Sequence, residues 1–405
     1  MKPDNGDVSD AGSTMDRRAR RQLRLSARAV GLALAIAAVM IVIAAVGGRI
    51  VRQRATPAAS DPPSATAAAS ASTTPTAGTT VTAGQMCRES NADPGLAPFN
   101  GQVVPDGRYV WVFGGHGVSQ FSAGTGRRLR TLSECSFDTG EAVVAAAAAG
   151  PELWILNGES LMTSFSNATG TLTGPVIAPL PVIGNLPQSP GALAATGQDL
   201  WVDSAGAVTE DSAVTGAVLR SISYGVRSPF GSIAAGAGRV WIASLEGGPG
   251  GAGALAELAA PSGRLLRTVS GSAVASPFAL ALASGQLWVI GDRNDLRPQL
   301  TELDAATGSL IRTISAPGYG FTEPFALAVS DGTVWVLNYD SATVINATTG
   351  AVVRVERGTS DGLAMPRYIA AVGNQIWITN AGGQTSISEY DARTGELMAI
   401  VSGPA

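Results

Sequence analysis

Seven tryptophans recur at nearly constant spacing and define a repeat that covers about three quarters of the chain. Successive tryptophans are 40 to 47 residues apart. They are Trp111, Trp154, Trp201, Trp241, Trp288, Trp335 and Trp377. Each stands between aliphatic residues, which is typical of a buried strand. A glycine three or four residues before each tryptophan predicts a tight turn leading into that strand.

A second marker keeps step with the tryptophans. The dipeptide Thr-Gly follows six of them, and Ser262-Gly263 takes its place in the remaining repeat. Glycine there supplies the positive φ of a hairpin turn. A short apolar strand follows the turn, as at residues 309–314, and a strand of small residues precedes each tryptophan strand, as at residues 277–282. Each repeat therefore predicts four strands.

Seven four-stranded repeats of this length predict an all-β fold, a seven-bladed β-propeller spanning residues 86–405. The small-residue strands belong next to the axis, and the tryptophan strands pack blade against blade. The repeats stay in phase from Phe99 to Val401. No strand from one terminus is therefore expected to complete a blade at the other terminus. Closure of the ring then rests on packing between sheets, unless residues 79–82 add an outer strand.

The first 85 residues predict membrane topology. Residues 29–48 carry no charge, and a helix of that length spans about 30 Å, which matches a bilayer. Seven basic residues precede the segment and three follow it closely, which predicts a cytoplasmic tail at residues 1–28 and an ectodomain outside. A cleaved signal peptide is the alternative. Residues 49–85, rich in Ala, Ser, Thr and Pro, predict a flexible linker.

The charge distribution and the content of lysine, histidine and cysteine limit the classes of function that the chain can have. Residues 1–54 have a net charge of +6 and residues 55–405 of −10, and such an acidic ectodomain argues against a nucleic-acid partner. With one lysine, Lys2, and one histidine, the chain offers no lysine chemistry in the folded part and no multi-histidine metal site. Cys87 and Cys135 are expected to form a disulfide outside the membrane, with two unpaired thiols as the alternative.

The Leu-Trp-Val core and the Asp-x-x-Thr-Gly turn, seen in full at residues 303–308 and 390–395, resemble the bacterial propellers of the YVTN, NHL and PQQ-like groups. They are also similar to the streptogramin-lyase propeller. The lyase resemblance implies a histidine acid–base with a metal-binding acidic residue, and only His116 could serve. The PQQ resemblance implies an acidic cofactor pocket with calcium, and the spacing identifies no such cluster. The cofactor is therefore unknown.

Several residues precede the innermost strands, in loops expected to ring one end of the axis. The candidate ligand-binding residues are Arg227, Tyr319, Glu323 and Arg367, with His116 in a glycine-rich loop. The alternative is that they are ordinary loop residues. Two formal glycosylation sequons, at Asn167 and Asn346, coincide with the repeat turns and are interpreted first as turn formers. No catalytic or metal-binding set is assigned.

These observations predict a non-catalytic binding or scaffold propeller held outside the cell membrane by a single-pass anchor. Its partner would be an envelope protein, a peptide or a glycan. The alternative is a metal-dependent lyase or lactonase-like enzyme with its site in the central channel. An extracellular sensor is a third possibility, and it would need a partner because the cytoplasmic tail is too short for an output domain.

Overall fold

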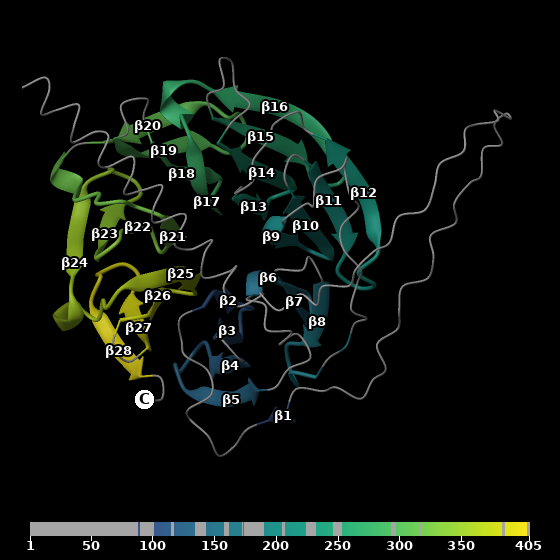
Figure 1. Cartoon of the computed structure of the whole chain (residues 1–405). Helices are drawn as coiled ribbons and strands as arrows, with labels where there is room; N and C mark the ends of the chain where they lie inside the picture. The colour runs from purple at the N-terminus through teal and green to yellow at the C-terminus, as the bar shows by residue number, and fades with distance from the viewer. Residues whose placement is uncertain are drawn as a thin grey trace, which may run out of the picture. The chain divides into compact units, whose positions relative to one another are not determined.

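The structure, a computed structural model, forms a ring of seven antiparallel sheets around a central axis (Figure 1). It describes residues 88–89, 101–114, 117–133, 143–157, 162–171, 173, 190–204, 207–223, 232–245, 253–292, 297–315, 317–382 and 385–402. The predicted seven-bladed propeller with four-stranded blades is confirmed.

Each blade follows the chain order from the axis outward. Blade one holds β2 (Val103–Pro105), β3 (Tyr109–Phe113), β4 (Gly117–Ser122) and β5 (Arg128–Ser133), with β1 (Arg88–Glu89) added at the outer edge of β5. Blade two holds β6 (Val143–Ala149), β7 (Glu152–Asn157) and β8 (Met162–Ser166). Blade three holds β9 (Pro190–Thr196), β10 (Asp199–Ser204), β11 (Ala207–Ser212) and β12 (Val218–Ser223). Blade four holds β13 (Ile233–Gly236), β14 (Arg239–Ser244), β15 (Ala254–Ala259) and β16 (Arg264–Ser270).

The last three blades repeat the same order. Blade five holds β17 (Pro277–Ala283), β18 (Gln286–Asp292), β19 (Pro298–Asp304) and β20 (Leu310–Ile314). Blade six holds β21 (Ala326–Ser330), β22 (Thr333–Leu337), β23 (Ser341–Asn346) and β24 (Val352–Arg357). Blade seven holds β25 (Pro366–Val372), β26 (Gln375–Asn380), β27 (Ser386–Asp391) and β28 (Leu397–Ser402). The short 3-10 turns η2 (Ser272–Val274), η3 (Pro317–Tyr319) and η4 (Thr359–Asp361) lie between the later blades.

The first strand of every blade lies nearest the axis, as Figure 1 shows. Each of these seven strands contacts the first strand of both neighbouring blades, so the inner wall is continuous. Small residues dominate it, as in the alanine run of β6. Small side chains are required because the blades converge at the axis. The predicted position of the small-residue strands is confirmed.

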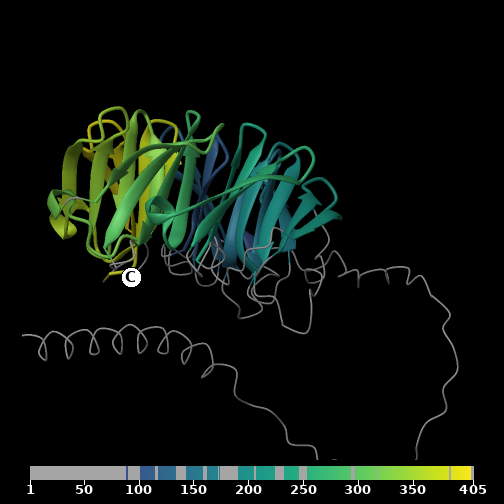
Figure 2. The same cartoon turned by 90° about the horizontal axis from the view of Figure 1, so that it is seen from above.

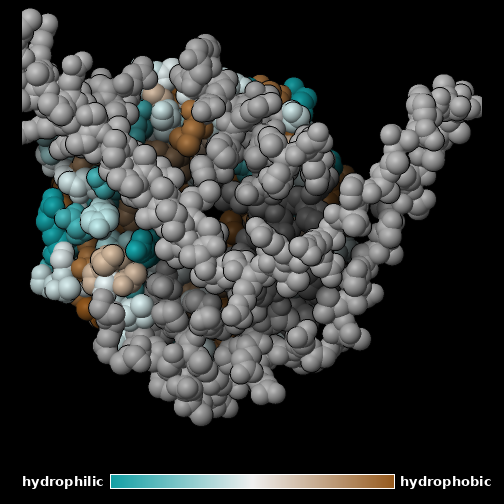
Figure 3. All heavy atoms as spheres, viewed as in Figure 1, coloured by the Kyte–Doolittle hydropathy of each residue, from teal (hydrophilic) through white to brown (hydrophobic). Residues whose placement is uncertain are grey.

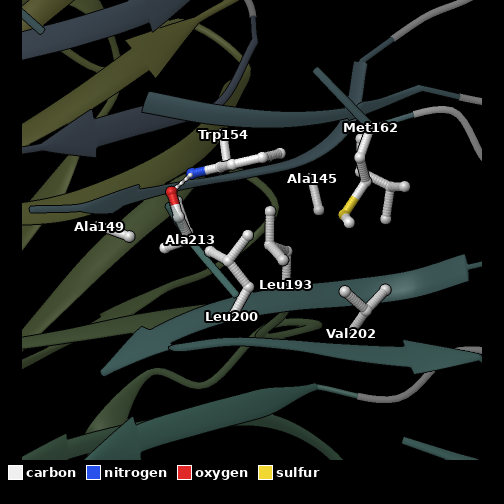
Figure 4. Close-up of a cluster of buried hydrophobic side chains, with 10 residues drawn as sticks. Ala145, Ala149, Trp154, Met162, Leu193, Leu200, Val202 and Ala213 are labelled. Atoms are coloured by element: carbon white, nitrogen blue, oxygen red, sulfur yellow. Dashed lines mark hydrogen bonds between the residues drawn. The ribbon is translucent and has the colours of Figure 1, made fainter. Parts of the chain in front are cut away.

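The tryptophans pack between blades, as predicted. All seven are 0 or 1% exposed. Trp154 packs against β9 and β10 of blade three, and its indole nitrogen donates a hydrogen bond of 3.1 Å to the carbonyl of Ala213 (Figure 4). Trp335 makes the same contact with Ala392 of blade seven, at 3.0 Å. At these two junctions, the alanine of the repeat turn therefore accepts the hydrogen bond of the tryptophan in the preceding blade.

The repeat turns are built as the Asp-x-x-Thr-Gly pattern predicts. The carboxylate of Asp304 accepts hydrogen bonds from the amides of Ala306 and Thr307, and Gly308 follows with φ of +68°. Asn346 accepts the equivalent bonds in blade six, so its interpretation as a turn former is confirmed. Asn167 differs. It occupies the alanine position one residue later, is buried, and donates to the carbonyl of Gly150.

Buried glutamates on the third strands pair with arginines on the fourth. In blades three, four and five, a guanidinium nitrogen lies 2.5 to 2.6 Å from a carboxylate oxygen. The pairs are Glu210 with Arg220, Glu257 with Arg267, and Glu302 with Arg312. The same arginines donate to carbonyls in the turn of the next blade, at Pro261, Ala306 and Thr348. One side chain therefore neutralises a buried charge and joins two blades.

Blades seven and one meet without exchanging a strand. Their junction is held by an apolar cluster in which Phe121 packs edge-on to Trp377, with ring centroids 5.6 Å apart. The hydroxyl of Thr379 also donates to the carbonyl of Gly101 at 3.1 Å. The expectation of in-phase blades closed by packing is confirmed. An outer strand is present in blade one as β1, whereas residues 79–82 lie outside the described residues.

Other sequence-based expectations also fall outside the described residues. These are the tail, the anchor segment, the linker and the pair Cys87 and Cys135. Within the described ranges, none of the helices has the length and hydropathy that crossing a bilayer requires.

Candidate functional site

The two ends of the ring differ in construction. One end carries the tight turns between first and second strands together with the Thr-Gly turns, and we call it the turn face. The other end carries the loops between second and third strands and the connections between blades, and we call it the loop face. Figure 2 shows the strands running between these two ends. Longer connections give the loop face the greater variety of side chains.

Buried asparagines hold the connections between blades in place at the loop face of blades six and seven. In blade six, Asn338 accepts a hydrogen bond from the amide of Thr322 at 3.3 Å and donates to the hydroxyl of Thr343 at 3.2 Å. In blade seven, Asn380 accepts from the amide of Ala364 at 3.1 Å. Both asparagines are fully buried and follow their tryptophan by three residues. The connections between blades are therefore held to the sheets by polar side chains of the core.

The connections into blades five, six and seven each end in a strained residue before a proline. Ser276, Glu323 and Met365 each precede the proline that opens or approaches an inner strand, and each has φ between +43° and +53°. This left-handed conformation costs a non-glycine residue on the order of 1 kcal/mol. The surrounding hydrogen bonds must hold it, so these loop ends are fixed rather than free to rearrange.

Large apolar side chains are exposed on these loops and next to them, where Tyr368 lies in the first half of β25. We call Phe325, Tyr339, Met365 and Tyr368 the loop-face patch. Their exposed fractions are 37, 63, 48 and 40%. Figure 3 shows hydrophobic and hydrophilic surface side by side in the described part of this face. Aromatic residues and methionine are enriched at protein interfaces, so the composition of the patch fits a binding surface.

The structure places the candidate ligand-binding residues in different surroundings. Glu323 and Arg367 are exposed at the loop face next to the patch, and they form no ion pair with each other. Tyr319 does not line the axis. Its ring packs between blades five and six, and its hydroxyl donates to the carbonyl of Gly350 at 2.9 Å. His116 and Arg227 lie outside the described residues.

A hollow of about 400 Å³ opens at the turn face of the channel, between blades seven, one and two. Turn residues line it, among them Asp106, Gly150 and Val372. Asp106 is its one ionisable lining residue, and its carboxylate already accepts hydrogen bonds from the amides of Arg108 and Tyr109. The hollow therefore presents mainly backbone and small side chains.

Most carboxylates with a perturbed pKa lie inside blades rather than in the channel. Burial raises the pKa of Glu210, Glu302 and Glu389, and in the first two the neighbouring arginine opposes the shift. Burial also raises the pKa of Asp211 to about 6. In the part of the chain that the structure describes, no three histidine, cysteine or acidic residues gather as a metal site.

The comparisons support the fold and assign no family. Neither protein-family models nor curated proteins match this sequence. Solved structures do match, among them three with 11 to 16% identity. The computationally designed protein Ika8 has 16% identity and a TM-score of 0.53, covering 79% of this chain and 91% of its own.

Two natural assemblies contain similar chains. A chain of the mitotic checkpoint complex has 14% identity and a TM-score of 0.53, covering 82% of this chain and 96% of its own. A chain of the Kuenenia stuttgartiensis hydrazine synthase has 11% identity and a TM-score of 0.54, covering 76% and 96%. One fold thus occurs in a designed protein, a checkpoint complex and an enzyme, so it does not decide the function.

The sequence pattern predicted candidate residues at one end of the axis but none of the four residues of the loop-face patch. Phe325 was assigned only to an inner strand, and Tyr339, Met365 and Tyr368 were not considered. A usable signal was present, since each lies within three residues of a conspicuous proline or of the asparagine that follows a tryptophan. Large apolar residues at such positions in a loop have no core to enter.

Proposed function

We propose that this chain is a non-catalytic binding or scaffold propeller, carried outside the cell membrane by residues 29–48. The loop-face patch supports the proposal most directly, because it exposes aromatic and methionine side chains on, or next to, loops held by buried asparagines. Fixed loops lose little conformational entropy on binding, which favours affinity. The partner class is an envelope protein or an extended peptide.

Crosslinking in intact cells tests this proposal. A tagged full-length chain is crosslinked, and co-purified proteins are identified by mass spectrometry. The double variant Tyr339→Ser/Met365→Ser removes the centre of the patch. Val214→Ser is the matched control, because Val214 is 69% exposed in the repeat turn of blade three. A partner that is retained by the control and reduced about tenfold by the double variant supports the proposal.

Two results would contradict it. Equal recovery of every partner by the wild-type chain and the double variant would exclude the patch as the binding surface. Stoichiometric divalent metal retained by the purified chain, together with turnover of a lactone or a cyclic ester, would favour the lyase or lactonase alternative. Protease accessibility of the ectodomain in whole cells tests the proposed location.

A further inference from the structure

The last blade departs from the glutamate–arginine pattern of blades three, four and five. Glu389 on β27 occupies the position of Glu210, Glu257 and Glu302, but Ala399 stands opposite it on β28 where they face an arginine. Glu389 is only 4% exposed. Among the described residues, no cation forms an ion pair with it. Its buried carboxylate is therefore uncompensated.

Geometry shows where the missing cation would sit. At other junctions the fourth-strand arginine lies against the glycine of the next repeat turn, as Arg267 lies against Gly308. At the junction of blades seven and one, the Glu389 carboxylate itself lies against Gly126. We call the space bounded by Glu389, Ala399 and Gly126 the seam slot. Arg127 and Arg128 follow in the same turn, and neither pairs with Glu389.

The edge strand beside the slot is unprotected. Edge strands in native proteins usually carry charges that discourage pairing with another chain. Of the six fourth strands that the structure describes, β28 alone has no ionisable side chain. Its sequence is Leu-Met-Ala-Ile-Val-Ser, with Met398 54% and Ile400 48% exposed. Among the residues that the structure describes, no strand pairs with its outer edge.

The protein already uses this mode of pairing once. In blade one, β1 pairs antiparallel with the outer edge of β5, with Arg88 opposite Ser133 and Glu89 opposite Leu132. A fourth strand of this propeller therefore accepts a fifth strand. Such strand addition takes affinity from main-chain hydrogen bonds and specificity from side chains.

We propose that β28 binds an extended strand of a partner protein that carries a lysine or arginine opposite Ala399. Residues opposite one another on neighbouring strands share a face of the sheet, so this cation points along the same face as Glu389. Two strand spacings, about 10 Å, separate the two backbones. The side chains of arginine and glutamate together cover that distance, and the methyl of Ala399 leaves the path open. Glu389 supplies the complementary charge.

Peptide binding to the full-length chain in detergent micelles tests the proposal. The probe is a fluorescent seven-residue peptide of alternating valine and threonine with arginine at its centre. The matched peptide has glutamine at that position. Anisotropy should give an affinity at least about tenfold higher for the arginine peptide, a difference typical of a desolvated charge pair. Ala399→Arg and Glu389→Gln should each abolish this preference.

Leu219→Arg is the matched control, because it adds the same charge to the outer strand of blade three. It should leave the arginine peptide's affinity unchanged. Equal binding of the two peptides, or a preference that survives Ala399→Arg, would overturn the proposal. A concentration-dependent dimer that Ala399→Arg dissolves would identify a second copy as the occupant and overturn it as well.

This inference names a second surface for the proposed binding function and rests on that function. The two can fail separately. The crosslinking experiment depends on Tyr339 and Met365 at the loop face, whereas the peptide experiment depends on Glu389 and Ala399 at the outer edge of blade seven.

Discussion

Replacing Asp211 with asparagine measures the cost of one buried charge in blade three. Asp211 on β11 is fully buried, and its position is apolar in the next three blades, where Leu258, Leu303 and Ile345 stand. Burial is the main reason why its pKa rises from 3.8 to about 6, and the charge of Glu210 adds to the rise. A hydrogen bond from Thr209 opposes it.

The sign of the pH dependence follows from the raised pKa. The folded chain holds the proton more tightly than the unfolded chain. This contribution to stability is therefore complete below about pH 4 and is lost as pH rises through about 6. A shift of roughly two units corresponds to about 3 kcal/mol. Asp211→Asn removes this loss, so its stability relative to the wild-type chain should grow by about 3 kcal/mol between pH 4 and pH 8.

Urea unfolding followed by tryptophan fluorescence provides the assay, with midpoints compared at several pH values. Asp304→Asn is the control. Asp304 is partly exposed, and hydrogen bonds from Thr307 lower its pKa, so any pH trend should have the opposite sign. Asn346 already fills the equivalent site in blade six, so the change should be tolerated. Parallel pH profiles for the wild-type chain and Asp211→Asn would refute the reasoning.

Three further predictions concern the ring. Trp335→Phe should destabilise the chain by about 2 kcal/mol in urea, because it removes one of the two donors to the carbonyl of Ala392, the other being the Thr333 hydroxyl, and opens a gap; no change in midpoint would contradict the inter-blade role. Gly308→Ala should cost about 1 to 2 kcal/mol, because alanine is strained at φ of +68° and its methyl group would press on the arginine of blade four; an unchanged thermal midpoint would argue against this. A thiol titration of the unreduced, denatured chain should find none free if Cys87 and Cys135 are paired, and two free thiols would exclude the disulfide.

The fold could be predicted because each blade repeats the same local rules. A tryptophan between aliphatic residues specifies a buried strand, and Thr-Gly specifies the turn after the third strand. Repetition turns weak local signals into a strong one. The role of the alanine in the turn was harder to predict. Its carbonyl accepts a hydrogen bond from Trp154 or Trp335, which lies more than 50 positions away in the sequence.

The candidate site was less predictable because loops do not repeat. The position of Tyr319 before an inner strand suggested the rim of the axis, but its connection folds back along blade six and the ring enters the gap between blades. The uncompensated charge at Glu389 was accessible in principle. Alignment of the fourth strands would have shown Ala399 where Arg312 and Arg267 stand.

Closure without strand exchange also bears on how such a ring changes in evolution. Each blade whose fourth strand is described takes all four strands from one continuous stretch of chain. A duplication or deletion of one repeat therefore adds or removes a whole sheet and leaves no strand without a partner. The number of blades is then limited by how tightly the inner strands can crowd around the axis, and the ring can be lengthened or shortened one repeat at a time.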